Sequence, residues 1–331
     1  MAAETNQATS TSRPLILHPM PQITSPVTTQ VIMRNVIIAL VPSLIAAVVF
    51  FGIDALIVCA VSVISCVGFE YLWCRLRKTE STIDDLSAVV TGLLLAFNVP
   101  STMPIYMVVI GAFVAIVVTK ELFGGIGFNF ANPAIVGRIF LAIAFPVAMT
   151  TFVAPQVALS PVDVVSTATP LSPSAEPLPL LDLFLGAHMG VLGETSALAI
   201  LLGFAWLLYT KTITWHMPVV YVGIVFVLSA LMGLNPVAQV CSGGLLLGAV
   251  FMLTDYATSP STLRGKLVYA AGAALIVSLI RFWGNLNEGV AFSILFMNLL
   301  VPHIDAVFVN TPVGGEATKR AAKEKGGKAH E

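Results

Sequence analysis

Long apolar stretches alternate with short polar ones along most of the chain. A helix needs roughly 20 apolar residues to cross a bilayer, and fewer where the helix is broken. The pattern therefore predicts an all-α polytopic membrane protein with about ten transmembrane helices. The predicted spans are 35–53, 55–73, 83–99, 103–120, 132–152, 194–210, 216–234, 236–254, 266–283 and 287–302.

Composition supports this prediction and excludes a typical soluble enzyme. Of the 331 residues, 57% are hydrophobic and only 10% are charged, whereas soluble domains contain about 25% charged residues. The four cysteines include no Cys-x-x-Cys pair, which argues against an iron–sulfur cluster or zinc ion held by this chain alone. The histidines are scattered through loops and segment ends, a pattern that does not favour a haem with two histidine ligands.

The basic residues predict the orientation of the segments. Lysine and arginine are enriched in short cytoplasmic loops, and with ten spans nearly all of them fall on one side, Arg281 being the exception. No lysine or arginine lies between Arg138 and Lys211. We therefore expect the polar loop in that interval to be extracytoplasmic and both termini to be cytoplasmic. The predicted parts are a cytoplasmic N-terminal arm (1–34), a first membrane repeat (35–152), an extracytoplasmic loop (153–193), a second membrane repeat (194–302) and a basic cytoplasmic tail (303–331).

Two sequence echoes suggest that the halves are related. The run Gly92–Leu95 reappears as Gly244–Leu247, and the Gly/Asn-rich turn Gly124–Pro133 is echoed by Gly284–Asn287. Because each half holds an odd number of spans, we expect two inverted five-helix repeats with broken helices, an arrangement that places ligand sites near the midplane. Chance recurrence of Gly-Leu runs in an apolar chain is the alternative.

The long polar loop contains the pattern Asp163-x-x-Ser166-x-Ala168-Thr169, followed by Pro170. It resembles the signature that flavin transferases read when they attach FMN to a threonine. A threonine hydroxyl can form a phosphoester with the FMN phosphate, the neighbouring alanine is small, and proline keeps the preceding backbone extended. The alternative is an ordinary Ser/Thr-rich loop with a helix cap.

The turn from Gly124 to Pro133 is the second candidate site. Its glycines permit tight turns and close approach of a planar ligand, and Asn129 and Asn132, three residues apart, can present amide groups to one side. Pro133 suits the first turn of a helix. No Gly-Lys-Ser/Thr follows, so this is not a phosphate-binding loop. The pattern fits a polar pocket for a ring system, or a helix breaker that lets the repeats pack.

Asp255, in the run Thr254–Pro260 that follows the eighth predicted span, is the third candidate. It can be a solvated anchor, a cation ligand, a hydrogen-bond acceptor, or a partner for Lys120 or Arg138. Charges buried in a membrane often mark functional sites. Glu70 and Arg138 also lie in or near apolar stretches, where structural pairing and an ion path are equally compatible with the pattern.

Taken together, these motifs make the chain resemble one protein family. That family contains the D subunit of the Rnf complex and the B subunit of the sodium-pumping NADH:quinone reductase. The resemblance covers nearly the whole chain, although Thr167 stands where that family often has glycine. It implies a flavin-carrying membrane subunit of an ion-translocating ferredoxin:NAD oxidoreductase in a bacterial or archaeal cell (inner) membrane. It further implies covalent FMN on Thr169 and non-covalent riboflavin near Asn129, Asn132 and Asp255.

The resemblance also implies partners. They are a cytoplasmic subunit that handles NADH and FMN, a single-span subunit with its own FMN, other membrane subunits, and Na⁺ or H⁺ as the transported ion. The main competing hypothesis is a small-solute channel or secondary transporter with no cofactor, and an assembly scaffold is a third. The flavin content of the chain discriminates between them.

Overall fold

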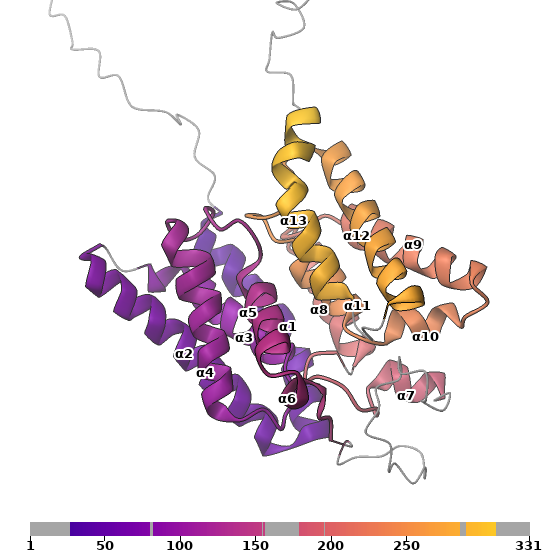
Figure 1. Cartoon of the computed structure of the whole chain (residues 1–331), viewed down its shortest axis with the longest axis horizontal. Helices are drawn as coiled ribbons and strands as arrows, with labels where there is room; N and C mark the ends of the chain where they lie inside the picture. Colours follow the sequence, from indigo (N-terminus) through magenta and orange to yellow (C-terminus); the bar gives the residue numbers. More distant parts are fainter. Residues whose placement is uncertain are drawn as a thin grey trace, which may run out of the picture.

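The computed structural model describes residues 27–79, 82–153, 155, 179–194, 196–284 and 289–308. Within these ranges all regular structure is helical (Figure 1). The predicted all-α class is therefore confirmed for the described part of the chain. Most of the predicted N-terminal arm and C-terminal tail lies outside it, and no observation tests the predicted domain boundaries.

Five helical segments are long and apolar enough to cross a membrane, which identifies a multi-pass membrane protein. They are α1 (Thr29–Phe51), α2 (Ile53–Arg77), α4 with its continuation (Ile105–Phe123), α12 (Leu263–Trp283) and α13 (Val290–Val307). The third of these is composite. It consists of α4 (Ile105–Phe113), the π-helix η2 (Val114–Lys120) and the 3₁₀ turn η3 (Glu121–Phe123).

The other predicted spans contain shorter or broken helices, so the total of ten stays a prediction. Four contain one short apolar helix of 10–17 residues: α3 (Ser87–Phe97), α5 (Pro133–Ala144), α8 (Ala197–Tyr209) and α9 (His216–Leu231). The eighth predicted span is divided into α10 (Pro236–Cys241), α11 (Leu245–Leu247) and the π-helix η4 (Gly248–Met252). The remaining elements are η1 (Ile83–Asp85), α6 (Pro146–Thr150) and α7 (Leu180–Leu185).

Glycine explains the break in the eighth segment. Gly243 and Gly244 have φ angles of 67° and 66°, a left-handed conformation that side chains with a Cβ rarely adopt. The chain therefore leaves α10 and restarts as α11. A proline marks the other interrupted segment, because α6 begins at Pro146 directly after α5.

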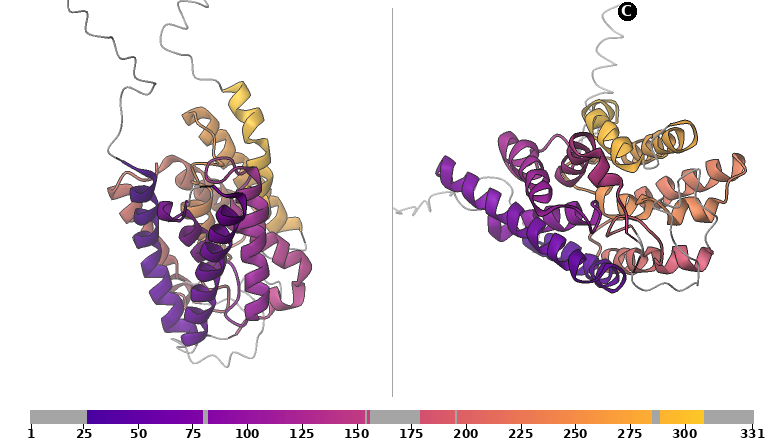
Figure 2. Two further views of the ribbon diagram at one scale, coloured as in Figure 1. Left: turned by 90° about the vertical axis from the view of Figure 1, so that its left-hand side faces the viewer. Right: turned by 60° about the horizontal axis from the view of Figure 1, so that its bottom comes forward.

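The two halves of the chain lie side by side (Figure 1). They are joined where α1 packs against α8 and where α13 packs against α5. The start of α1 and the end of α13 lie at one side of the helical body, whereas α6 and α7 lie toward the other (Figures 1 and 2). The described ends that flank residues 156–178 are therefore on the side away from the chain's described termini.

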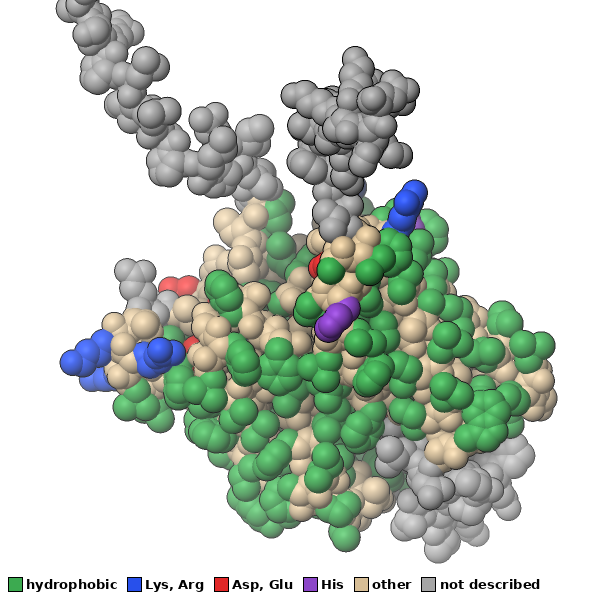
Figure 3. Space-filling view, turned by 45° about the horizontal axis from the view of Figure 1, so that its top comes forward, with side chains coloured by type: hydrophobic (Ala, Val, Ile, Leu, Met, Phe, Trp, Pro, Cys, Tyr) green, Lys and Arg blue, Asp and Glu red, His purple; other side chains and the backbone are tan. Residues whose placement is uncertain are grey.

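The surface is mainly hydrophobic, and several charged side chains are buried, as expected for a membrane protein. In Figure 3 the described surface is mostly apolar, and basic side chains gather at edges of the view. Exposed large apolar side chains follow the outer faces of the long helices, as at Ile45 and Ile64. Glu70 and Lys120, in contrast, are almost completely buried.

The similar sequence runs in the two halves do not adopt the same local structure. Gly92 lies inside α3, where a Cβ would come 2.7 Å from Val63 Cα of α2, whereas Gly244 precedes α11 with a positive φ. Residues 285–288 of the second echo are outside the described part. A different pair does match: Asn132–Pro133 starts α5 and Asn235–Pro236 starts α10, and each asparagine Oδ1 accepts two backbone N–H bonds.

Candidate functional site

A pocket lies between the two halves, where α1, α3, the start of α5, the end of α8 and the end of η4 meet. Its cavity volume is about 90 Å³, and the pocket is partly open to solvent. One wall is apolar and one end carries amide, hydroxyl and charged groups. The lining residues are Ile32, Met33, Val36, Ser87, Val90, Thr91, Leu94, Lys120, Ile126, Asn129, Asn132, Pro133, Leu207, Ile213, Val250, Phe251, Thr254, Asp255, Tyr256 and Ala257.

The pocket brings together all three residues that the sequence suggests for a ring-binding site. Asn129 and Asn132 come from the turn before α5, and Asp255 comes from the turn after η4. Asn132 Nδ2 donates to Asp255 Oδ2 at 3.4 Å. Residues 123 positions apart are therefore in contact, and their shared position is a result of tertiary packing.

Two π-helices bring groups to this pocket. Lys120 is the last residue of η2, and η4 supplies Val250 and Phe251. A π-helical turn shifts the side chains that follow it relative to an α-helix and occurs often at functional sites. Here the shifted turns lie on two walls of one cavity.

Asn132 and Asp255 are held by a network that reaches α13. Asp255 accepts from Thr258 Oγ1 at 3.1 Å and from Ala257 N at 3.4 Å. With its amide oriented to satisfy its neighbours, Asn298 accepts from Asn132 N at 3.1 Å and donates to Thr258 O at 3.2 Å. The polar end of the pocket is thus fixed by three separate segments.

Of the alternatives for Asp255, the structure shows the hydrogen-bond acceptor. The side chain is half-buried in the turn that follows η4. Burial raises the pKa of Asp255 above the ordinary value of an aspartate, and the hydrogen bonds from Thr258, Ala257 and Asn132 oppose that rise. Among the described residues no basic side chain forms an ion pair with it.

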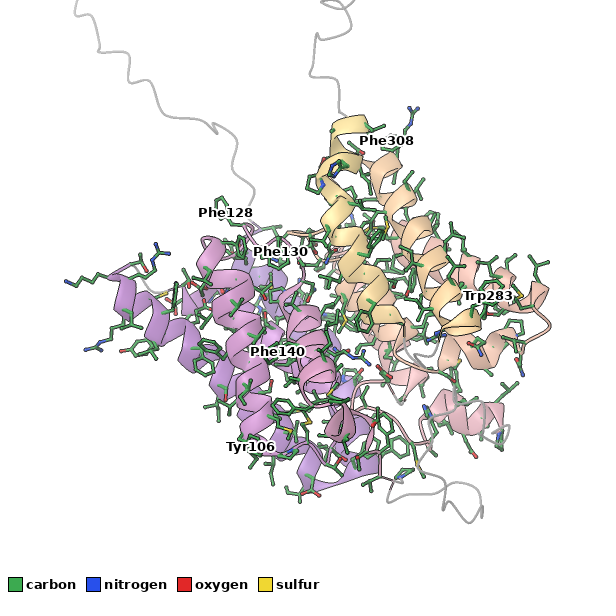
Figure 4. All side chains as sticks on the ribbon, in the orientation of Figure 1. Tyr106, Phe128, Phe130, Phe140, Trp283 and Phe308 are labelled. Atoms are coloured by element: carbon green, nitrogen blue, oxygen red, sulfur yellow. The ribbon has the colours of Figure 1, made fainter. Side chains whose placement is uncertain are left out.

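Asn129 is a buried side chain with capacity left for a ligand. Its Nδ2 donates to Ala131 O at 3.0 Å, and no described residue donates to its Oδ1. The flanking Phe128 and Phe130 are exposed and lie at the same end of the molecule as Phe308, whereas Tyr106 lies at the opposite end (Figure 4). The pocket's polar end is therefore near the side where α13 ends.

Lys120 pairs with Glu70 and not with Asp255. Its Nζ lies 2.7 Å from Glu70 Oε2 and donates to Ser87 Oγ at 2.6 Å. Thr82 donates to the other Glu70 oxygen at 2.6 Å. Glu121 is a more distant partner, 3.7 Å from the Lys120 ammonium. This network forms the charged wall of the pocket at the start of α3.

Arg138 belongs to a second polar centre that does not line the pocket. Its NH1 atom donates to Asn98 Oδ1 at 2.8 Å and lies 3.3 Å from Glu194 Oε1. All three side chains are buried. Arg281 donates to the backbone carbonyls of Gln239 in α10 and of Ser242 and Gly243 between α10 and α11.

Comparison with known proteins identifies the family. Residues 16–314 match the model of the NQR2, RnfD, RnfE family. The chain is 42% identical over 311 residues to the D subunit of the Na(+)-translocating ferredoxin:NAD(+) oxidoreductase complex of Acetobacterium woodii, covering 92% of this chain and 96% of the relative. The chain belongs to the NQR2, RnfD, RnfE family.

Further members of the family agree with this assignment. The D subunit of the proton-translocating ferredoxin:NAD(+) oxidoreductase complex of Clostridium ljungdahlii is 41% identical, over 83% of this chain and 88% of that protein. The D subunit of the ion-translocating oxidoreductase complex of Escherichia coli is 36% identical, over 83% of this chain and 91% of that protein. The family resemblance inferred from the sequence motifs is confirmed.

The proposed FMN attachment residues of this family member cannot be placed. Asp163, Ser166, Ala168 and Thr169 all lie outside the described residues. The covalent site therefore stays a prediction from sequence. Within the ranges that the structure does describe, no three His, Cys, Asp or Glu side chains are arranged to hold a metal ion.

Sequence reasoning misses part of the pocket wall. The pattern marks Glu70 and Lys120 but does not predict their pairing, and it does not single out Ser87. The available signal is weak: Glu70 lies well inside the 25-residue apolar helix α2, beyond the Asp54 of its first turn, and Lys120 ends another apolar segment. Buried opposite charges in a membrane protein tend to pair with one another, and that tendency is the one rule that could have found the wall.

Proposed function

We propose that this chain is the D subunit of an ion-translocating ferredoxin:NAD⁺ oxidoreductase complex. The observation that carries the proposal is the match over most of the chain to subunits with that name, supported by the pocket between the halves. As such a subunit it relays electrons across the membrane and couples them to movement of Na⁺ or H⁺. Its partners are the other subunits of the complex.

The first proposed cofactor is FMN, bound through its phosphate to Thr169. Support comes from the Asp163-x-x-Ser166-x-Ala168-Thr169 pattern and from the position of α6 and α7, which flank the loop on the side away from the start of α1. A loop on that side meets a single-span FMN subunit outside, while a cytoplasmic subunit that handles NADH and FMN binds on the inner face.

The second proposed cofactor is riboflavin, held without a covalent bond in the pocket. The residues fit such a ligand: an apolar wall for the ring, and Asn129 Oδ1, which accepts no hydrogen bond from any described residue, for a ring N–H. Asn132 and Asp255 close the polar end. When bound, a flavin supplies reversible electron transfer, whereas the chain's own residues orient it and exclude water.

Two flavins explain why the subunit spans the membrane. A hydrocarbon core of about 30 Å separates its faces, and a carrier within the helical body divides that distance into shorter steps. The proposed arrangement is ten spans in two inverted repeats, with both termini cytoplasmic. Coupling to ion movement then uses a change between the repeats, which meet at this pocket.

The test is covalent flavin on the intact polypeptide. The full chain is produced with its flavin transferase, purified, and run on a denaturing gel under ultraviolet light. We expect fluorescence and the mass increase of one FMN, both lost in Thr169→Ala and both kept in the matched control Thr167→Ala. Absence of added mass in the wild-type chain contradicts the covalent site. A channel or secondary transporter without cofactor predicts no fluorescence in any variant.

A further inference from the structure

The charged side chains that line the pocket differ in whether they have an ion-pair partner in the described part of the chain. Only two of its lining residues are charged, Lys120 and Asp255. The Lys120 ammonium is neutralised by Glu70 at 2.7 Å and also donates to Ser87. Asp255 has no such partner among the described basic residues. The lining therefore presents no free positive charge and one acid.

Three backbone N–H groups at the helix starts beside the pocket already have acceptors within the chain. Phosphate sites in proteins often use free N–H groups at a helix start. At the start of α5, the N–H groups of Ala134 and Ile135 are both taken by Asn132 Oδ1. At the start of α3, Ser87 N donates to Asp85 Oδ1 at 2.7 Å. Both helix starts thus have these N–H groups satisfied internally.

We propose that Glu70 and Asp255 are the specificity determinants that exclude phosphate from this pocket. Glu70 forms an ion pair with Lys120, so the ammonium does not attract a ligand phosphate. Asp255 repels an anion at the polar end of the pocket. A phosphate monoester carries a charge of about −1.5 to −2 near neutral pH, so the pocket takes the neutral riboflavin and rejects FMN. The inference rests on the proposed non-covalent flavin site and assigns residues to its selectivity.

The selectivity is measured on full-length chain carrying Thr169→Ala, so that all retained flavin is non-covalent. The purified protein is equilibrated with equal concentrations of riboflavin and FMN, passed through a desalting column, denatured, and its flavins separated by chromatography. Because like charges at a recognition site are strongly disfavoured, we expect riboflavin to exceed FMN by roughly tenfold. Equal retention of the two flavins overturns the inference.

Two variants test the residues separately. Asp255→Asn removes the acid. Glu70→Gln keeps an amide oxygen that can accept from Lys120, turns its amide N–H toward the Thr82 hydroxyl, and leaves the ammonium without its counter-charge. We expect the ratio of FMN to riboflavin to rise several-fold in each. Glu121→Gln is the matched control, because Glu121 has the same charge but lies 3.7 Å from Lys120 and does not line the pocket.

Lumichrome, which has the ring but neither ribityl chain nor phosphate, reports whether the pocket is intact. A variant that binds lumichrome like its parent is folded at this site, and its flavin ratio is then decisive. If the Glu70→Gln variant no longer binds lumichrome, the flavin ratio of Asp255→Asn alone decides the test. An unchanged ratio in a lumichrome-binding Asp255→Asn protein refutes the role of Asp255. If the parent retains neither flavin nor lumichrome, the proposed pocket ligand fails, which is a different result from unselective binding.

Discussion

The two ends of α3 each contact a buried basic side chain, but the charges around the two side chains differ. Each end is contacted by a buried basic side chain: Lys120 donates to Ser87 at the start, and Arg138 donates to Asn98 just beyond the last residue. A helix carries partial positive charge at its start and partial negative charge at its end. The same kind of side chain is therefore disfavoured at one end and favoured at the other.

The surroundings follow this asymmetry. Lys120 has Glu70 at 2.7 Å and Glu121 at 3.7 Å, and Asp85 accepts from the serine that starts the helix. Arg138 has Glu194 within ion-pairing distance, at 3.3 Å. Among the ion pairs of the described residues, the lysine at the end with the unfavourable dipole has two acids within 4 Å. This end of the helix also forms the pocket wall.

The largest expected effect is from Glu70→Leu. This change leaves the Lys120 ammonium buried beside the positive end of α3, and breaking a buried ion pair costs about 3–5 kcal/mol of unfolding free energy. Reversible unfolding in detergent, followed by circular dichroism, measures the loss. Glu70→Gln is the control and loses less, because the amide oxygen still accepts from Lys120. A Leu variant as stable as the wild type contradicts the importance of this pair.

A smaller effect is expected from Glu194→Leu at the other end. Arg138 keeps its 2.8 Å bond to Asn98 and the favourable dipole at the helix end. We therefore expect a loss of about 1–3 kcal/mol, within the range for an unsatisfied buried group. The same unfolding experiment applies. Equal losses for Glu194→Leu and Glu70→Leu show that the helix dipole does not distinguish the two ends.

Local rules predict some of the site from sequence. Pro133 is expected in the first turn of a helix, and it is the first residue of α5 with Asn132 as the cap. Asn129 and Asn132 are expected to face one side, and both line the pocket. These features depend on neighbouring residues only, which is why a pattern a few residues long is sufficient to find them.

Such local rules do not predict which side chains from distant parts of the chain contact one another. The sequence leaves Asp255 open to pairing with Lys120 or Arg138, yet it accepts from Asn132 instead, because η4 and the turn after it place it beside the start of α5. The division of the eighth apolar segment at Gly243–Gly244 is equally hidden. Hydropathy records how apolar a segment is, but not whether it is one helix or three.

The smallest expected effect is from Ser87→Ala, which removes a hydroxyl that accepts from Lys120 and donates to Asp85 Oδ1. The ammonium keeps its 2.7 Å ion pair with Glu70, so we expect a loss of about 1–2 kcal/mol, the usual contribution of two hydrogen bonds. The midpoint of unfolding in one detergent, compared with that of the wild type, measures the loss.

Asn98→Ala is the matched change at the other end of α3. Like the serine change it removes two hydrogen bonds, here the 2.8 Å bond from Arg138 and the 2.6 Å bond from Asn98 Nδ2 to Leu94 O. The ion pair that Arg138 keeps, with Glu194, is the longer of the two compared, at 3.3 Å. The remaining acid therefore compensates less, and we expect this variant to unfold at the lower midpoint. If Ser87→Ala is instead the more destabilising change, the acids at the start of α3 do not compensate for the lost hydroxyl. The difference in charge between the two ends is then not what stabilises this helix.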